Sequence, residues 1–246
     1  MNWHSISAAE ALAQLNVNQK QGLTGQSAAQ RQKKYGKNKL AEKKPKSLFL
    51  RFLEQFSDFM VIVLLIAAAI SFFTARISGD GDYIDSIIIL LIVIINAITG
   101  VVQESKAEKA IAALKKLSAP HARVIRNSKP AEIASEDLVP GDILLLEAGD
   151  FVPADARLLE AVNLKAEESA LTGESLSVEK NASARCPEAA PLGDRKNMVF
   201  SSSTITAGHG TCVVTSTGME TQVGRIAHMI NQEDSDRKST RLNSSH

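Results

Sequence analysis

Two long apolar segments stand out from a chain that is otherwise polar or mixed. The first is amphipathic from residue 48 and uniformly apolar over 59–73, and the second is almost pure Ile, Leu and Val over 87–95. A helix needs about 20 apolar residues to cross a bilayer, and neighbouring residues extend both segments to that length. A buried globular helix is the alternative for the first segment alone, but the second segment disfavours it. We therefore expect two transmembrane helices, over 57–76 and 84–102.

The second apolar segment continues without a helix breaker into a strongly helix-forming sequence that ends before Pro120. One helix over 83–117 would measure about 52 Å, which carries the span out of the bilayer as a cytoplasmic stalk. Residues 48–117 are therefore expected to form the membrane part of the chain. Asn96 and Thr99 within this helix fit either a transport path or helix packing, and we favour packing.

The charge distribution indicates a topology. The first 51 residues carry ten Lys or Arg side chains and two Glu, whereas the loop at 76–85 between the apolar segments is acidic. Cytoplasmic segments beside membrane helices are rich in Lys and Arg. The loop is therefore expected outside, with both chain ends in the cytoplasm. A net charge of +1 and an aromatic content of 4% argue against a nucleic-acid-binding protein.

Residues 1–47 are expected to form a helical cytoplasmic module. Ser7 is followed three residues later by Glu10, which is the spacing of a capping box at a helix start. Thr24 or Ser27 can cap a second helix in the same way.

Residues 118–218 combine short apolar runs with Gly and Pro turns, which is typical of a jelly-roll-like or sandwich all-β domain. The expected strands are 122–126, 143–147, 156–161, 198–200, 203–206 and 210–216. A linker helix capped by Thr221 is expected over 219–233, leading toward a third span that this sequence lacks. Residues 234–246 are polar without a core pattern, and we interpret them as a non-native or disordered tail.

The candidate chemistry lies in one stretch of this β-rich region, Thr172-Gly173-Glu174-Ser175. Gly173 permits a turn that a side chain would hinder, so Glu174 is presented at the tip of a loop. A carboxylate in that position can orient or deprotonate a water molecule. A surface turn with a solvated glutamate is the alternative, and four residues alone favour it.

Other reactive side chains give no site. Cys186 and Cys212 are far apart and form no C-x-x-C pair, so two reduced thiols are expected. The five histidines have no metal-ligand spacing, and the acidic cluster around Asp80 is too short for an EF-hand loop. We therefore expect no metal site in this sequence.

Six motif-bearing stretches occur in a defined order: 22–40, 54–71, 96–111, 137–143, 152–155 and 171–175. With them the chain resembles the N-terminal part of a P-type cation-transporting ATPase, most closely the calcium-pump branch. The resemblance covers residues 5–233 and comprises an N-terminal module, the first two membrane helices and a β-rich actuator domain. It is the joint presence of the stretches that makes the resemblance specific.

The resemblance implies a role for the loop. In that family ATP phosphorylates an aspartate, and the actuator domain then brings this loop onto the aspartyl phosphate. Glu174 would activate the water that hydrolyses the phosphate. Thr172 and Gly173 would shape the approach of the loop, and Ser175 would fix its exit. The stalk would couple rotation of the β domain to movement of the membrane helices.

The resemblance also implies what a complete protein requires. It would use ATP and Mg²⁺ on phosphorylation and nucleotide-binding domains, and this sequence has no Asp-Lys-Thr-Gly-Thr motif. The chain alone is therefore expected to bind neither cofactor and to be inactive. Its expected partners are membrane lipid, the transported cation and those missing domains.

The transported ion is expected to be calcium, with sodium and protons left open. The absence of an N-terminal C-x-x-C argues against soft metal ions. The compact loops suit the plasma membrane of a bacterium. The alternative function is a non-catalytic, membrane-anchored actuator-like module that binds or regulates a partner.

Overall fold

The computed structural model describes residues 2–41, 47–78, 83–117, 120–173 and 176–230. The chain divides into two units, and one of them joins residues 1–41 to residues 119–246. The segment between them, residues 42–118, forms the other unit. The tail at 234–246 lies outside the described residues.

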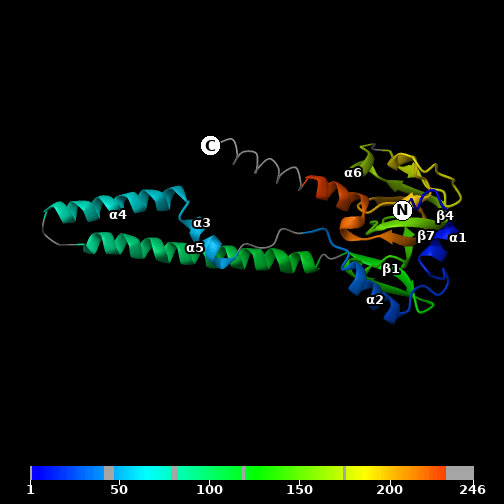
Figure 1. Cartoon of the computed structure of the whole chain (residues 1–246), viewed down its shortest axis with the longest axis horizontal. Helices are drawn as coiled ribbons and strands as arrows, with labels where there is room; N and C mark the ends of the chain where they lie inside the picture. The colour runs from blue at the N-terminus through cyan, green and yellow to red at the C-terminus, as the bar shows by residue number, and fades with distance from the viewer. Residues whose placement is uncertain (1, 42–46, 79–82, 118–119, 174–175, 231–246) are drawn as a thin grey trace. The chain divides into compact units, whose positions relative to one another are not determined.

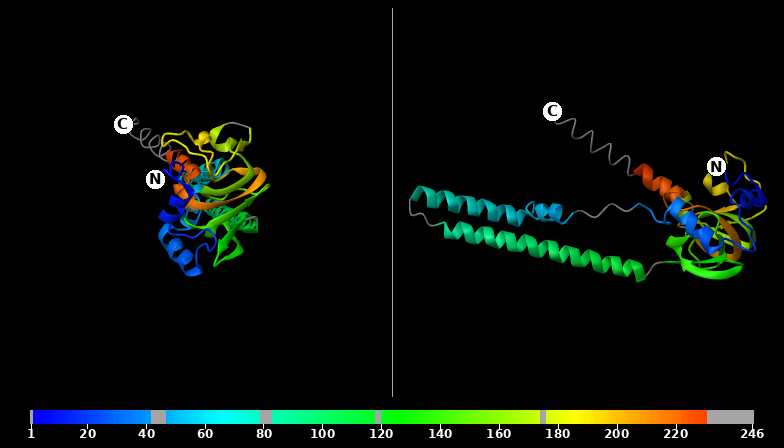
Figure 2. Two further views of the ribbon diagram at one scale, coloured as in Figure 1. Left: turned by 90° about the vertical axis from the view of Figure 1, so that its right-hand side faces the viewer. Right: turned by 60° about the horizontal axis from the view of Figure 1, so that its bottom comes forward.

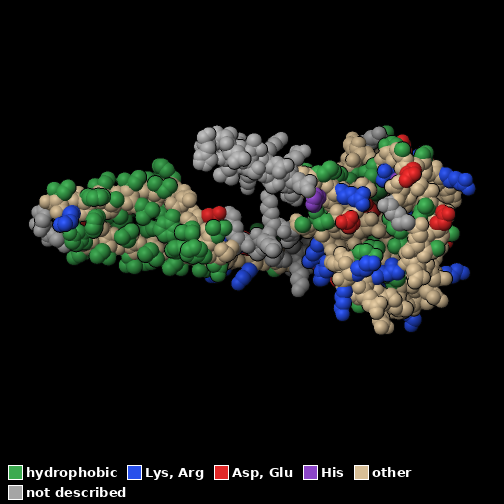
Figure 3. Space-filling view, viewed as in Figure 1, with side chains coloured by type: hydrophobic (Ala, Val, Ile, Leu, Met, Phe, Trp, Pro, Cys, Tyr) green, Lys and Arg blue, Asp and Glu red, His purple; other side chains and the backbone are tan. Residues whose placement is uncertain are grey.

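The described part of the 42–118 unit consists of three helices (Figure 1): α3 Leu48–Gln55, α4 Phe59–Ser78 and α5 Ile84–Leu117. α5 spans both the expected second span and its stalk. A turn at 56–58 separates α3 from α4, so the amphipathic start is a helix of its own. α4 and α5 are both long and apolar enough to cross a membrane. Green apolar side chains cover their surfaces in Figure 3.

α5 contacts both α3 and α4, and its described side chains include buried small residues and an ion pair to α3. Ala97 of α5 is buried, and Gly100 lies so close to α3 that a Cβ there would be 2.6 Å from the Gln55 Oε1 atom. Small side chains allow this approach of helix backbones. The Arg51 guanidinium of α3 lies 2.7 Å from the Glu108 carboxylate of α5. These contacts join α3 to residues 100–108 of α5.

The other unit is built on a seven-stranded sheet in the order β2-β1-β3-β7-β4-β5, with β6 also paired to β4. The strands are β1 His121–Arg126, β2 Lys129–Ala134, β3 Ile143–Glu147, β4 Asp155–Glu167, β5 Val178–Glu179, β6 Met198–Val199 and β7 Thr204–Ser216. Every pairing between these strands is antiparallel. The antiparallel β domain is therefore present, while its jelly-roll arrangement stays a prediction.

The sheet buries apolar side chains on both faces because alternate residues of a strand point to opposite sides. Leu144 belongs to the main core cluster, whereas Ile143 packs in a second cluster with Val213. The second cluster is completed by α1, Ala8–Gln14. Figure 2 shows the N-terminal helices, in blue, against the sheet. The N-terminal segment that we expected as a module of its own therefore shares a core with the sheet.

Three helix starts agree with the sequence expectations. Ser7 and Glu10 form the predicted capping box of α1. Thr24 caps α2, Gly25–Tyr35, through a hydrogen bond from the Ser27 backbone N–H. The Thr221 hydroxyl oxygen accepts a hydrogen bond of 3.0 Å from the Gly224 backbone N–H, at the start of a helical stretch that is described over 222–230.

The strand prediction over 203–216 was wrong in one respect: two separate strands were expected, and β7 is continuous. Two residues of β4, Asn163 and Leu164, lie opposite the single residue Gly208 at this point, and the φ of +74° at Gly208 lets β7 stay in the sheet beside that bulge. A Cβ there would lie 2.3 Å from the backbone oxygens of Val162 and Asn163. The predicted strands also omitted β2, whose exposed polar residues and Pro130 give no apolar alternation.

Candidate active-site loop

The candidate loop lies between β4 and β5 and begins in a helical turn. β4 ends at Glu167, and one turn of helix, α6 Ser169–Thr172, follows before Gly173. β5 returns beside the end of β4, with Val178 opposite Ala166. Both ends of the loop are therefore held by the same pair of strands.

Gly173 ends α6 in the left-handed conformation, with φ 76° and ψ −1°. Its backbone N–H donates to the Ser169 carbonyl at 3.0 Å, which closes the helical turn. The Thr172 hydroxyl donates to the Glu168 carbonyl at 3.1 Å. A Cβ at position 173 would meet no atom within 4 Å, so the need for glycine comes from the backbone angle rather than from crowding.

The loop leaves toward β5 through an exposed stretch. The Leu176 side chain is 81% exposed, and the Ser177 hydroxyl accepts a hydrogen bond of 3.0 Å from Thr206 of β7. Glu174 and Ser175 lie outside the described residues, so their predicted roles stay predictions. Thr172 and Gly173 are in the loop as expected, although Thr172 belongs to a helical turn that the sequence did not indicate.

A buried ion pair lies at the base of the loop, and the sequence reasoning missed it. The Lys180 Nζ atom is 2.5 Å from the Glu168 Oε1 atom, and both side chains are 0% exposed. Burial raises the pKa of Glu168 and lowers the pKa of Lys180, and each charge opposes the shift of the other. Lys180 also lies 5.5 Å from the centre of the Phe200 ring. The two residues are twelve positions apart in the sequence, so no local spacing could have indicated the pair.

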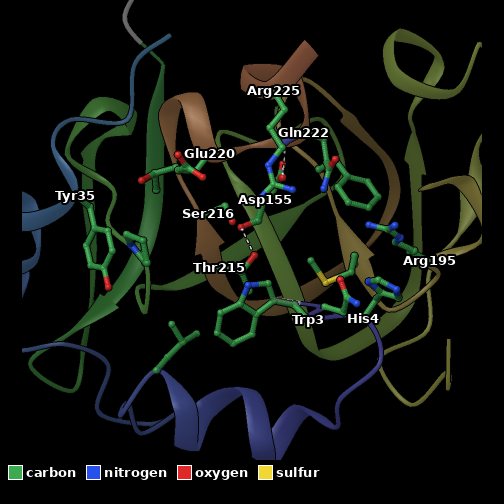
Figure 4. A pocket seen from close by; sticks show the side chains of 16 residues that line it. Trp3, His4, Tyr35, Asp155, Arg195, Thr215, Ser216, Glu220, Gln222 and Arg225 are labelled. Atoms are coloured by element: carbon green, nitrogen blue, oxygen red, sulfur yellow. Dashed lines mark hydrogen bonds between the residues drawn. The ribbon is translucent and has the colours of Figure 1, made fainter. Parts of the chain in front are cut away.

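A separate cavity of about 400 Å³ lies between the N-terminal segment, the sheet and the helix at 222–230. Figure 4 shows Asp155 in it, with Arg225, Arg195 and Trp3 around it. Burial raises the pKa of Asp155 to about 6, although backbone N–H groups and the arginines oppose the shift. None of the loop residues that the structure describes lines this cavity. Among the described residues, no cluster of three or more His, Cys, Asp or Glu could hold a metal ion.

Two family models match the chain, and together they cover most of it. One, the P-type ATPase actuator domain, matches residues 116–231, which contain the whole sheet and the candidate loop. The other, the N-terminus of cation transporters and ATPases, matches residues 3–71. The chain therefore carries the N-terminal and actuator regions of a P-type ATPase. With two apolar helices of spanning length, it is a membrane protein.

The chain is also similar to several P-type ATPases that are named as calcium or cation transporters. The chain is 47% identical over 239 residues to calcium-transporting ATPase 1 of Bacillus cereus, covering 96% of this chain and 26% of that protein. It is 47% identical over 242 residues to calcium-transporting ATPase lmo0841 of Listeria monocytogenes, covering 98% and 26%. Probable cation-transporting ATPase F of Mycobacterium tuberculosis is 42% identical over 227 residues, covering 92% and 24%. The chain thus spans about a quarter of the length of these relatives.

Proposed function

We propose that this chain is the actuator-bearing part of an ATP-driven cation pump, and that Glu174 activates the water that hydrolyses an aspartyl phosphate. The observation that carries the proposal is the left-handed Gly173 cap at an exposed end of the loop, inside a region matched by the actuator-domain model. A carboxylate that follows such a cap can reach a phosphate on another domain.

We also propose roles for the residues beside Glu174. The Thr172 hydroxyl donates to the Glu168 carbonyl, which helps to fix the last turn before the glutamate. Gly173 supplies the change of direction, and Ser175 is proposed to fix the exit of the loop. Hydrolysis of an acyl phosphate needs a water held in line by a nearby base, so the rate depends on the geometry of the loop as well as on the carboxylate.

The test is Glu174→Gln in the longer protein that contains this sequence. Phosphoenzyme formation from ATP is expected to persist, and its decay is expected to slow by about 10²- to 10⁴-fold, the usual contribution of a general base. Glu179→Gln is the matched control, because Glu179 is an exposed glutamate on β5. Normal decay of the Glu174→Gln phosphoenzyme would reduce Glu174 to a solvated turn residue.

Calcium is the proposed cargo, on the strength of the relatives that are named calcium-transporting ATPases. Vesicles that contain the longer protein should accumulate calcium on addition of ATP, and uptake of sodium or protons alone would contradict the choice. We place the protein in a bacterial plasma membrane with both ends of this chain in the cytoplasm. A cysteine introduced by Asp80→Cys should then react with an impermeant thiol reagent added outside intact cells.

ATP and Mg²⁺ are proposed to act on other domains of the longer protein, so the chain alone should show no vanadate-sensitive ATPase activity. The second candidate is a non-catalytic, membrane-anchored module that binds or regulates a partner. The gene sequence beyond the codon for Glu233 separates the two, because only a pump continues to an Asp-Lys-Thr-Gly-Thr motif.

A further inference from the structure

Burial of the charged pair Glu168 and Lys180 carries a desolvation penalty, so it is a poor way to stabilise a domain. Moving two charges out of water costs several kcal/mol per ion, and a well-packed apolar pair of similar volume is often as stable or more stable. Apart from their mutual contact, neither charged group has a hydrogen-bonding partner among the described residues. The pair therefore calls for an explanation other than stability.

The two residues lie at the two ends of the candidate loop. Glu168 immediately precedes α6, and its carbonyl accepts hydrogen bonds from the backbone N–H groups of Leu171 at 2.9 Å and Thr172 at 3.0 Å. Lys180 immediately follows β5, and its backbone N–H donates to the Leu164 carbonyl of β4 at 2.8 Å. A movement of either side chain would therefore move a backbone segment that leads into the loop.

We propose that the ion pair of Glu168 and Lys180 fixes the entry of the candidate loop relative to its exit, so that both are positioning residues for the loop. The link to catalysis rests on the function proposed above for Glu174, whereas the ordering of the loop does not. An ion pair suits this task because it requires one contact of defined length, while apolar side chains can slide past each other.

The neighbouring contacts support a fixed arrangement. The Phe200 ring faces the Lys180 ammonium from another segment of the chain, which confines the side chain on a second side. The helix end that the pair supports is short, with four residues in α6. So short a helix has little stability of its own and depends on the groups at its ends.

The test replaces the charges while it keeps the volume, as Glu168→Leu together with Lys180→Met. The control is Lys165→Met together with Glu179→Leu, because this exposed pair lies opposite on the same two strands. Both double variants and the parent protein are compared as the 246-residue chain in detergent. Hydrogen exchange at the backbone amides of 171–173 reports the order of the loop, and fluorescence of Trp3, the single tryptophan, reports the fold.

The Glu168→Leu, Lys180→Met variant, called the apolar pair below, is expected to retain the unfolding transition of the parent. Hydrogen exchange at the amides of 171–173 is expected to be at least about tenfold faster in this variant than in the parent. The control pair is expected to leave exchange unchanged. Unchanged exchange in the apolar pair, with the fold retained, would overturn the proposal. If the apolar pair does not fold, Glu168→Asp replaces it in the test. This variant keeps the charge but shortens the side chain, so the proposal requires that it also speeds hydrogen exchange at these amides.

In the longer protein the apolar pair is expected to form phosphoenzyme normally and to slow its decay by about 10- to 100-fold, the cost of a small misplacement. Glu174→Gln distinguishes the two proposals. If that variant decays normally while the apolar pair speeds exchange, the positioning proposal survives and the catalytic role of the loop is refuted.

Discussion

The Asp155 Oδ2 atom accepts a hydrogen bond of 2.8 Å from the backbone N–H of Gln222. This bond joins the first residue of β4 to the first turn of the helical stretch at 222–230. The Oδ1 atom accepts a second bond, 2.9 Å long, from the Ser201 backbone N–H. A carboxylate that is 3% exposed thus anchors the segment through which the chain leaves the β domain.

Asp155 is expected to make the stability of this unit depend on pH between about 4 and 6. Burial raises its pKa from 3.8 to about 6, so the folded state holds the proton more tightly than the unfolded state does. Its contribution to the free energy of unfolding is then fully present below pH 3.8 and is lost as pH rises through about 6. The loss amounts to about 3 kcal/mol.

The measurement is urea unfolding followed by Trp3 fluorescence at several pH values, in the parent and in Asp155→Asn. The difference between the two stability curves should change across pH 4–6 and be flat above and below that window, because the amide does not titrate. Asp194→Asn, at an exposed position, is the control and should give no such change. A constant difference for Asp155→Asn would show that burial does not perturb this carboxyl group.

Arg157 is expected to be among the most sensitive positions for folding. Its guanidinium is buried and donates to four carbonyl groups, those of Ile6, Leu158, Ala182 and Asn197. Arg157→Met would remove this donor from all four oxygens, of which that of Asn197 keeps the backbone N–H of Leu158, and should lower the free energy of unfolding by about 4 kcal/mol.

Chemical denaturation followed by Trp3 fluorescence measures this cost. Arg185→Met is the matched control, because Arg185 is exposed and surface substitutions usually change stability by less than about 0.5 kcal/mol. Equal effects of the two substitutions would mean that the carbonyl contacts of Arg157 contribute nothing to stability.

Gly22 is expected to tolerate no side chain. Its φ is +63°, and a Cβ would lie 1.8 Å from the Ile125 carbonyl oxygen of β1, next to the bridge between Leu23 and Arg126. Gly22→Ala should therefore cost about 4 kcal/mol, since the backbone on both sides must shift.

Gly149→Ala separates steric overlap from backbone strain. Gly149 has a similar positive φ of +97°, but a Cβ there would meet nothing within 4 Å. It should cost about 1–2 kcal/mol, which is the backbone term alone. Thermal unfolding of the two variants gives the stability lost in each, and the difference between the two losses measures the steric overlap at position 22. Equal losses would contradict the close approach of Gly22 to β1.

Much of the fold follows from local rules that the sequence displays directly. The capping box of Ser7 and Glu10, the Thr221 cap and the uninterrupted course of α5 depend on neighbouring residues, so spacing alone predicts them. The continuity of β7 could not be predicted in this way. It depends on how Gly208 packs against β4, which is a contact between distant segments.

The candidate site likewise has residues that local sequence rules predict and residues that only the folded chain brings together. The turn at Gly173 was expected from the sequence because the turn chemistry of glycine is local, whereas the role of Thr172 came from the resemblance and stays a prediction. Glu168 and Lys180 were not identified from the sequence, because charged residues are usually exposed and only the assembled strands bury these two together.

The division of one unit between the two ends of the chain has a consequence for synthesis on the ribosome. Residues 1–41 emerge first, but β1 and β3, which complete their core, are translated only after the two apolar helices. Residues 1–41 therefore cannot complete their core until the two apolar helices and the strands after them have been synthesised. With both ends of this chain in the cytoplasm, as proposed above, insertion of the two helices as a hairpin would bring the early and late segments to the same membrane surface. The bilayer would then shorten the search between them.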